Sequence, residues 1–344
     1  MKPRPSFFAH LHPPTIPARE ARFRHTFGLG GLALLLCGVL GLTGALELFY
    51  YEPSLAGANA SVQTITFLVP LGGLVRSLHY WAAQWLVAVV GLHLLRVLLT
   101  AAYKPPRRFN WLLGLGLLVL VLLLDFTGYA LRWDQGIAWA LLVGTNLLKS
   151  VPLVGPALYG VVVGGPALGA SSLLRFYAWH IFGLTLALVI GVGWHLFRVR
   201  RDGGIASAKP AAPALADPPR ISRQELVQRE ALVALLATAA LVVVAAAVPP
   251  ALGPAADFSA LPERPTAPWF FIWVQELLRL GTPWVWGVAV PLGLLTLLAL
   301  LPYALDRRAE GAGQWFGRAG RMGQWLALGL GLLLGALTLS GVLR

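Results

Sequence analysis

Two apolar stretches of the chain carry a pair of histidines each. Residues 76–96 read RSLHYWAAQWLVAVVGLHLLR, and residues 175–195 read RFYAWHIFGLTLALVIGVGWH. The histidines are His79 and His93 in the first stretch and His180 and His195 in the second, fourteen and fifteen residues apart. At about 100° per residue of an α-helix, each pair lies within about 60° of one line along its helix, with about 21 Å between its members along the axis.

The composition places both stretches in a membrane protein. Of 344 residues, 57% are hydrophobic and 12% are charged, and the mean hydropathy is +0.71. One soluble core cannot hide that much apolar surface, which excludes a soluble enzyme, a disordered chain and a disulfide scaffold. We expect an all-α integral membrane protein. Seven apolar segments approach the roughly 20 residues that cross a bilayer: 28–51, 79–101, 111–133, 176–197, 231–248, 285–304 and 324–342.

The basic residues predict the orientation of these spans. Nineteen of the 27 Lys and Arg residues fall in the N-terminal arm and in the segments after the second, fourth and sixth spans. Seven fall in the segments of the opposite side. The positive-inside rule therefore places the N-terminus in the cytoplasm and the C-terminus outside. Topology explains the net charge of +13, so no nucleic acid partner is needed.

The spans divide the chain into four parts. We expect a cytoplasmic N-terminal arm at 1–27, a four-helix bundle at 28–202, a cytoplasmic linker at 203–228 and a three-helix C-terminal domain at 229–344. The linker is rich in Ala, Pro and charge. The outer segments 134–175 and 249–283 combine prolines with aromatic and apolar runs, which predicts short helices at the membrane interface.

The histidines form two couples across the bilayer in this topology. The second and fourth spans both run from the outer to the inner side. His79 is then level with His180 near the outer face, and His93 is level with His195 near the inner face. Ionisable side chains inside a membrane are costly and indicate function. The alternative is four unrelated histidines, each hydrogen-bonded to backbone.

Two ligands per site favour haem over a bare metal ion. Zinc takes four ligands, and the single cysteine, Cys37, excludes a cysteine-based metal site. A haem supplies four nitrogens itself and needs only two axial ligands. The couples therefore predict two bis-histidine haems, with His79, His93, His180 and His195 as the metal ligands.

Glycines repeat at the same interval on the neighbouring spans. Gly30 and Gly44 on the first span are fourteen residues apart, and so are Gly114 and Gly128 on the third. Glycine removes the side chain that would block a macrocycle between helices. The shared interval predicts that these four positions border the haems.

Two arginines stand close to the histidines. Arg76 lies three residues before His79, and Arg96 lies three residues after His93. Each is positioned to pair with a haem propionate. The alternative is an arginine that extends to the membrane interface.

Several motifs resemble the cytochrome b/b6 family. They are Arg-Ser-Leu-His79-Tyr-Trp, Leu-His93-Leu-Leu-Arg96, Gly128-Tyr129-Ala-Leu-Arg-Trp133-Asp134-Gln135 and Arg175-Phe-Tyr-Ala-Trp-His180. Further on, residues 249–257 (PPALGPAAD) and Gly293-Leu-Leu-Thr296 resemble subunit IV of the b6f complex. The resemblance covers about residues 23–343, so the chain looks like cytochrome b6 fused to subunit IV. It implies a four-helix dihaem bundle plus three further spans.

The resemblance implies a subunit of a quinol:cytochrome c-type oxidoreductase in the bacterial cytoplasmic (inner) membrane. Quinol, either menaquinol or ubiquinol, would be oxidised near an outer haem on His79 and His180. One electron would leave to a Rieske iron–sulfur protein or a c-type cytochrome, multihaem types included. The other would cross through an inner haem on His93 and His195 to a quinone-reducing site. A homodimer within a larger complex is also implied.

The resemblance places an outer quinol pocket between Tyr129, Trp133 and the two outer segments. The family's Pro-Glu-Trp-Tyr, whose Glu takes a quinol proton, reads here Ala267-Pro268-Trp269-Phe270. Two acids are candidates to replace this Glu: Glu276, two turns on, and Asp125 in the third span. The alternative for Asp125 is a residue that is only hydrogen-bonded.

Other departures and one inner motif complete the resemblance. Arg132 stands where the family has Pro, and Tyr80 where it has Arg. Gly28 stands where the b6 type has the cysteine for an extra covalent haem, so no third haem is expected. Arg200, with Arg201 and Asp202, matches a basic pair at the inner quinone site, with ordinary anchoring by positive charge as the alternative.

Two other functions stay open. One is a dihaem anchor or electron conduit for another redox subunit, without an outer quinol site, which the Pro268 substitution favours. The other is a haemless transporter or scaffold, against which the aligned histidines and glycines argue.

Overall fold

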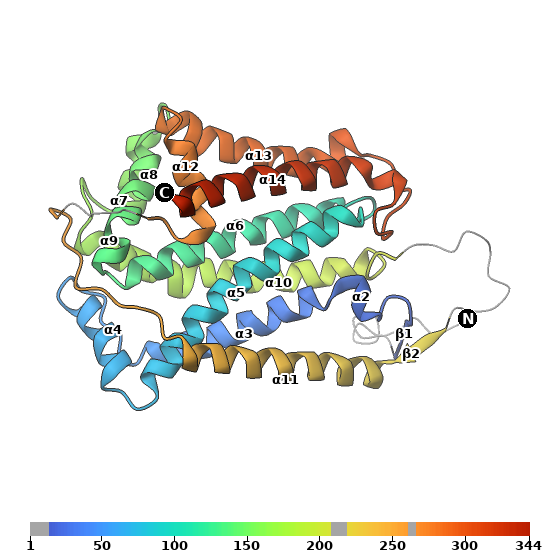
Figure 1. The fold of residues 1–344 in the computed structure, drawn as a ribbon, viewed down its shortest axis with the longest axis horizontal. Helices are drawn as coiled ribbons and strands as arrows, with labels where there is room; N and C mark the ends of the chain where they lie inside the picture. The colour runs from blue at the N-terminus through green and yellow to red at the C-terminus, as the bar shows by residue number, and fades with distance from the viewer. Residues whose placement is uncertain (1–13, 208–218, 261–265) are drawn as a thin grey trace.

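The computed structural model describes residues 14–207, 219–260 and 266–344, which are mostly helical (Figure 1). Within these residues, seven helices are long and apolar enough to cross a membrane, so the predicted number of spans is confirmed. They are Leu29–Glu47 (α3), Gly72–Leu99 (α5), Arg108–Leu131 (α6), Ala170–Arg201 (α9, Ala170–Ala178, and α10, Leu184–Arg201), Arg223–Ala247 (α11), Trp284–Leu305 (with α13, Val290–Leu300) and Arg318–Leu343 (with α14, Arg321–Leu343).

The second span begins earlier than predicted, at Gly72 instead of residue 79. Its first turns contain Arg76. The side chain is buried, and it donates a hydrogen bond to the carbonyl of Pro250. A buried and partnered arginine therefore extends the helix that carries His79.

Short helices gather at one end of the molecule (Figure 1). The segment 134–175 forms α7 (Gln135–Lys149) and α8 (Gly155–Val163), and the segment 249–283 contains α12 (Ile272–Leu278). Short helices were predicted in both segments, and both contain them. A further helix, α4 (Gly57–Phe67), joins α3 to α5 and was not predicted.

A small antiparallel sheet joins the N-terminal arm to the linker. The strands β1 (Thr15–Pro17) and β2 (Arg220–Ser222) pair, and α2 (Phe23–Thr26) follows β1. Ser222 caps α11 by accepting a hydrogen bond from the backbone N–H of Glu225, so this helix begins inside the predicted linker. Residues 1–13 of the arm and 208–218 of the linker lie outside the described residues.

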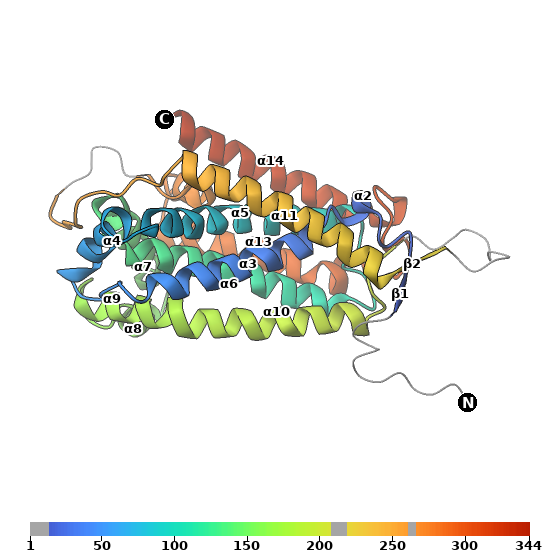
Figure 2. The same cartoon turned by 90° about the horizontal axis from the view of Figure 1, so that it is seen from below.

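The histidine-bearing spans belong to a four-helix bundle. Helix α3 packs against α5, and α6 packs against α10. Helix α11 lies along one flank of this bundle, against α5 and α3, whereas α13 and α14 lie along the other, against α6 and α5 (Figures 1 and 2). The three C-terminal spans therefore straddle the bundle.

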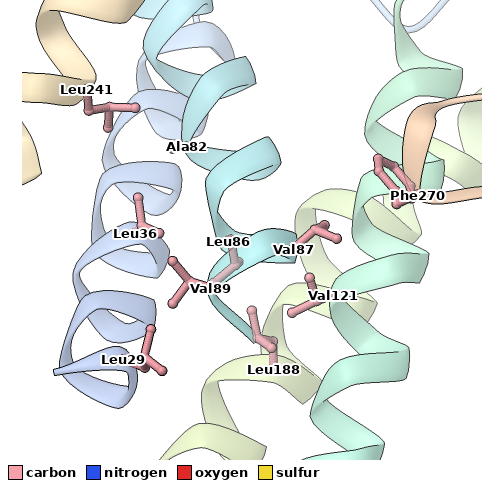
Figure 3. Close-up of a cluster of buried hydrophobic side chains, with 10 residues drawn as sticks. All are labelled: Leu29, Leu36, Ala82, Leu86, Val87, Val89, Val121, Leu188, Leu241 and Phe270. Atoms are coloured by element: carbon pink, nitrogen blue, oxygen red, sulfur yellow. The ribbon is translucent and has the colours of Figure 1, made fainter. Parts of the chain in front are cut away.

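The centre of the bundle is apolar. Leu36, Leu86, Val121 and Leu188 belong to one buried cluster that draws on α3, α5, α6 and α10. Val87 and Val121 point toward one another between α5 and α6 (Figure 3). Close packing of this kind holds membrane helices together, because lipid gives no hydrophobic drive for their association.

A buried ion pair fastens the inner end of the bundle to the C-terminal helices. The Lys104 ammonium lies 2.8 Å from the Asp306 carboxylate, and both side chains are largely buried. The hydroxyl of Tyr103 donates to the same carboxylate at 2.7 Å. Lys104 also donates to the carbonyls of Glu310 and Ala319. The loop after α5 is thereby tied to the segment between α13 and α14.

Candidate redox site

The four histidines lie on two helices, and the structure explains why they are fourteen residues apart on one and fifteen on the other. His79 and His93 lie on the regular helix α5. His180 lies in a π-helical turn, Trp179–Gly183, and His195 lies in α10 behind it. A π turn inserts one extra residue into an α-helix. The fifteen-residue step on this helix is therefore equivalent to the fourteen-residue step on α5.

The outer couple has the separation of two axial ligands. The ring centres of His79 and His180 are 6.3 Å apart. Two metal–imidazole bonds of about 2 Å, together with the distance from each ring centre to its nitrogen, span about 6 Å. Within the described residues there is no group of three or more His, Cys, Asp or Glu side chains placed to hold a metal ion. The pair therefore fits a centre that brings its own equatorial ligands, such as haem, better than bare zinc.

Hydrogen bonds fix the tautomer of both outer histidines. The Thr43 hydroxyl donates to the carbonyl of Val39 at 2.7 Å, so it accepts from His79 Nδ1 at 2.9 Å. The Thr127 hydroxyl likewise donates within α6, and His180 Nδ1 lies 3.1 Å from it. With the proton on Nδ1 of each ring, the Nε2 lone pair is free to bind a metal.

The carbonyl of Leu124 gives His180 a second acceptor. It lies 3.1 Å from His180 Nδ1, on the same turn of α6 as Thr127. Since a carbonyl only accepts, this contact independently assigns the Nδ1 proton. The His180 ring is therefore held by two groups of one rigid helix.

Glycines lie directly against the outer rings. A Cβ atom on Gly44 would stand 3.1 Å from Cε1 of His79, and one on Gly128 would stand 2.9 Å from Cε1 of His180. Contacts this short force the neighbouring group to move. The predicted glycines of this level are therefore needed for the ring positions.

The inner couple also has a glycine against each ring, with more room, but within the described residues it lacks the Nδ1 hydrogen bonds of the outer couple. His195 Nδ1 is buried without a hydrogen-bond partner among the described residues. A Cβ atom on Gly30 would lie 3.8 Å from His93 Cε1, and one on Gly114 would lie 3.4 Å from His195 Cε1. All four predicted glycines thus face the four histidines, one against each ring.

Each predicted arginine keeps a buried nitrogen without a partner. Arg76 donates to Pro250, and Arg96 Nε donates to the carbonyl of His25 at 3.2 Å. Arg76 Nε and Arg96 Nη2 are buried, and neither has a hydrogen-bond partner among the described residues. Unpaired guanidinium N–H groups inside a membrane protein suit an anionic group such as a propionate.

An aromatic wall surrounds Tyr129 at the outer end of α6. The Tyr129 ring lies 6.2 Å from Tyr80 and 6.1 Å from Phe270, measured between ring centres. The guanidinium of Arg132 lies 5.0 Å from the centre of the Tyr129 ring. Trp133 is buried against Phe258, with 5.5 Å between ring centres. The structure therefore brings the end of α6 together with the segment 249–283.

The turn after Pro268 connects this wall to α5. The Pro268 carbonyl accepts a hydrogen bond from the backbone N–H of Phe271 at 2.7 Å. The Trp269 indole donates to Gln84 Oε1 on α5 at 2.9 Å. Trp269 thus joins the wall to α5, and Phe270 faces Tyr129 on α6.

The two candidate acids lie in different places. Glu276 is buried between α12 and α14, 2.9 Å from Arg279 and within hydrogen-bond distance of Ser340. Asp125 is buried on α6, one turn from Tyr129, and makes no hydrogen bond or ion pair with any described residue.

Arg200 lies at the inner end, in a cavity of about 230 Å³. The cavity is also lined by residues of β1, by Gly203 and Gly204, and by Glu20 and Arg220. Burial raises the pKa of the Glu20 carboxyl above its ordinary value, opposed by Arg19 and by the hydrogen bond from Ser207. The cavity therefore places basic groups and a carboxyl inclined to hold its proton side by side.

Sequence reasoning missed several residues of these sites. Thr43 and Thr127 each stand directly before a site glycine, and this repeated Thr-Gly pair was a readable signal. Gln84 carried no signal, because a glutamine in a long span has no characteristic spacing. Its contact with Trp269 joins parts of the chain about 185 residues apart.

Sequence comparison gives a family and close relatives. The family described as cytochrome b(N-terminal)/b6/petB matches residues 84–256. Cytochrome b6 of Heliomicrobium gestii is 42% identical over 177 residues, which is 52% of this chain and 83% of that protein. Cytochrome b6 of Heliobacterium modesticaldum is 41% identical, over 51% of this chain and 82% of that protein. Cytochrome b6 of Synechococcus elongatus is 37% identical, over 51% and 81%.

A solved structure matches nearly the whole fold. A chain of the structure titled "Hyperthermophilic respiratory Complex III" superposes with a TM-score of 0.76, over 92% of this chain and 90% of that chain. The sequences are 23% identical, so this likeness shows the fold alone. It extends over most of the part that the cytochrome b6 relatives leave uncovered.

Proposed function

Because the chain belongs to the cytochrome b(N-terminal)/b6/petB family, we propose that it is the dihaem cytochrome b subunit of a quinol:cytochrome c-type oxidoreductase. It is a multi-pass membrane protein of cytochrome b6 type, and members of this family bind haem b. The proposal retains the predicted parts: the arm at 1–27, the dihaem bundle at 28–202, the linker at 203–228 and the subunit IV-like region at 229–344.

The observation that carries the proposal is the outer histidine couple. His79 and His180 stand at the separation of two axial ligands, and both Nδ1 protons are engaged so that both Nε2 atoms are free. His93 and His195 would hold the second haem. When bound, the two haems supply one-electron transfer without an open iron position.

Residues around the histidines suit both proposed haem positions. The glycines on α3 and α6 leave the histidine rings their positions. Arg76 and Arg96 keep buried N–H groups free for the propionates. The threonines hold the outer rings and raise their basicity as ligands.

The outer quinol pocket is proposed at the aromatic wall. Tyr129, Trp133, Trp269 and Phe270 offer flat apolar faces for a quinone ring, and Pro268 shapes the turn between them. The quinone type, menaquinone or ubiquinone, stays open. The proposed electron acceptor is a Rieske iron–sulfur protein or a c-type cytochrome, and the proposed assembly is a homodimeric complex in the bacterial cytoplasmic membrane.

The inner quinone site is proposed at the cavity beside Arg200. Reduction of a quinone takes up protons, and this cavity lies at the cytoplasmic end predicted by the charges. Arg200 and Arg220 would bind quinone oxygens there, with Glu20 as an adjacent proton carrier.

A second function is favoured by one specific observation. Pro268 stands where the family motif has its acid, and Glu276, one candidate replacement, is paired with Arg279. A dihaem conduit that feeds another redox subunit, without outer quinol oxidation, would need no acid there.

Quinol turnover separates the two functions. The purified complex should oxidise quinol with electrons reaching a c-type acceptor, and an inhibitor of the outer site should stop it. A matched variant, Trp269→Leu, removes one aromatic wall and should raise KM. If both haems are reduced equally well with the inhibitor present and in the Trp269→Leu variant, the dihaem conduit is favoured.

A further inference from the structure

Two buried polar side chains face the same level of the bundle from α5 and α6. The rings of Tyr80 and Tyr129 meet near the outer end of these antiparallel helices. Deeper in the bundle, Val87 and Val121 point toward one another (Figure 3). Gln84 lies one turn below Tyr80, and Asp125 lies one turn below Tyr129. Between the tyrosines and the valines, the register therefore places Gln84 opposite Asp125.

Neither side chain is satisfied by the protein. Gln84 is 6% exposed and Asp125 is 7% exposed. The indole N–H of Trp269 can only donate, so the amide oxygen of Gln84 faces Trp269 and its NH₂ group faces away. That Nε2 atom is buried without a hydrogen-bond partner among the described residues. Unpaired amide and carboxyl groups inside a membrane are costly, so their presence together indicates a ligand.

Asp125 lies one turn below Tyr129 of the aromatic wall and has no hydrogen-bond or ion-pair partner among the described residues. Tyr80 and Tyr129 are the titratable groups one turn above it, and Arg132 lies over the Tyr129 ring. Among the described acids of this end, Asp134 caps α7 and Glu276 pairs with Arg279. Glu47 lies near Arg76 and keeps one buried oxygen without a hydrogen-bond partner in the described part of the chain.

We propose that Gln84 and Asp125 form the hydroxyl-binding and proton-accepting end of the outer quinol pocket, an inference that rests on the proposed function. Gln84 Nε2 donates a hydrogen bond to the quinol oxygen, and Trp269 holds the amide in that orientation. The Asp125 carboxylate accepts the quinol hydroxyl proton, so the quinol O–H bond breaks and an Oδ–H bond forms. The accompanying electron leaves to the iron–sulfur or c-type partner.

Four variants of the complex test this assignment, with a short-chain menaquinol and a short-chain ubiquinol as probes. Asp125→Asn should lower kcat about 100-fold, since a lost general base removes that order of rate, while KM and both haem spectra are retained. Asp125→Glu should restore most of the rate. Gln84→Met, which tests a positioning residue, should raise KM more than it lowers kcat. The control Glu52→Gln, an exposed acid at the same end, should behave as the wild type.

The pH profile adds a readout that a structural role would not move. The wild-type rate should rise with pH as Asp125 ionises, and the Asp125→Asn profile should lose that limb. A wild type that oxidises neither quinol would refute the proposed function. A wild type that oxidises quinol, together with an Asp125→Asn variant of equal rate and profile, would refute only the assignment of Asp125.

Infrared spectroscopy covers the case in which Asp125→Asn does not assemble. Quinol-minus-oxidised difference spectra of the wild type should show a protonated carboxyl band that shifts in D₂O. The band should move in Asp125→Glu and stay in place in Glu52→Gln. A spectrum without such a band, or one that Asp125→Glu leaves unchanged, overturns the proposal.

Discussion

Gly128→Ala is the substitution whose effect follows most directly from the structure. The new Cβ would stand 2.9 Å from Cε1 of His180, which is closer than real Cβ contacts allow. The ring cannot easily yield, because Leu124 and Thr127 hold its Nδ1 from the same helix that would carry the new methyl group. Either the hydrogen bonds or the ring position must change.

The expected magnitude is moderate and specific to the outer site. Overpacking of this kind costs about 1–3 kcal/mol. If that free energy comes out of haem binding, the affinity of the outer site falls roughly 5- to 150-fold. Gly30→Ala is the matched control, because its Cβ would lie at an ordinary 3.8 Å from His93. Both variants gain the same helix propensity, so their difference isolates the clash.

Transfer of haem to apomyoglobin measures this difference. Purified Gly128→Ala should lose one haem faster than the wild type and keep the other, and redox titration should identify the lost haem as the outer one. Gly30→Ala should keep both. Equal retention in the two variants, or earlier loss of the inner haem from Gly128→Ala, would refute the reasoning.

Three further predictions concern other parts of the molecule. Asp306→Asn leaves the Lys104 ammonium buried without its countercharge, which should destabilise the protein by about 3 kcal/mol and lower its thermal midpoint; an unchanged midpoint would show that the pair is not structural. Burial raises the pKa of Glu20 above its ordinary value of 4.5, so the folded protein should lose stability as pH rises above 4.5 and Glu20 ionises. The thermal midpoint should therefore fall with pH less steeply in Glu20→Gln than in the wild type, and an equal fall in both proteins would argue against this role. Thr127→Val removes one acceptor from His180 Nδ1 and should raise the outer haem midpoint potential by up to roughly 40 mV, about 1 kcal/mol for one electron, whereas a fall would contradict the assigned tautomer.

The sequence predicted what depends on periodicity and composition. Span number follows from apolar length, and the placing of glycines against histidine rings follows from a shared fourteen-residue interval. The π turn at His180 could not be predicted from the sequence. A step of fourteen residues and a step of fifteen both leave the two histidines near one face of a regular α-helix, so the spacing does not reveal an inserted residue. The π turn is the physical reason why fifteen residues on one helix match fourteen on the other.

Long-range contacts account for most of what the sequence did not predict. The early start of α5 depends on a hydrogen bond from Arg76 to the carbonyl of Pro250, which lies far along the chain. The separation of α11 from α13 and α14 depends on which faces of the bundle remain uncovered. Gln84 becomes part of the proposed site only because Trp269, from a distant segment, donates a hydrogen bond to it. No local pattern encodes such pairings.

A haem count on the purified protein tests the central claim most directly. A pyridine haemochrome assay with a reduced-minus-oxidised spectrum should give two non-covalent b haems per chain. His79→Ala and His93→Ala should each remove one haem, the outer and the inner respectively, and leave the other. A folded and inserted protein without haem, or with haem that neither substitution removes, would contradict the account.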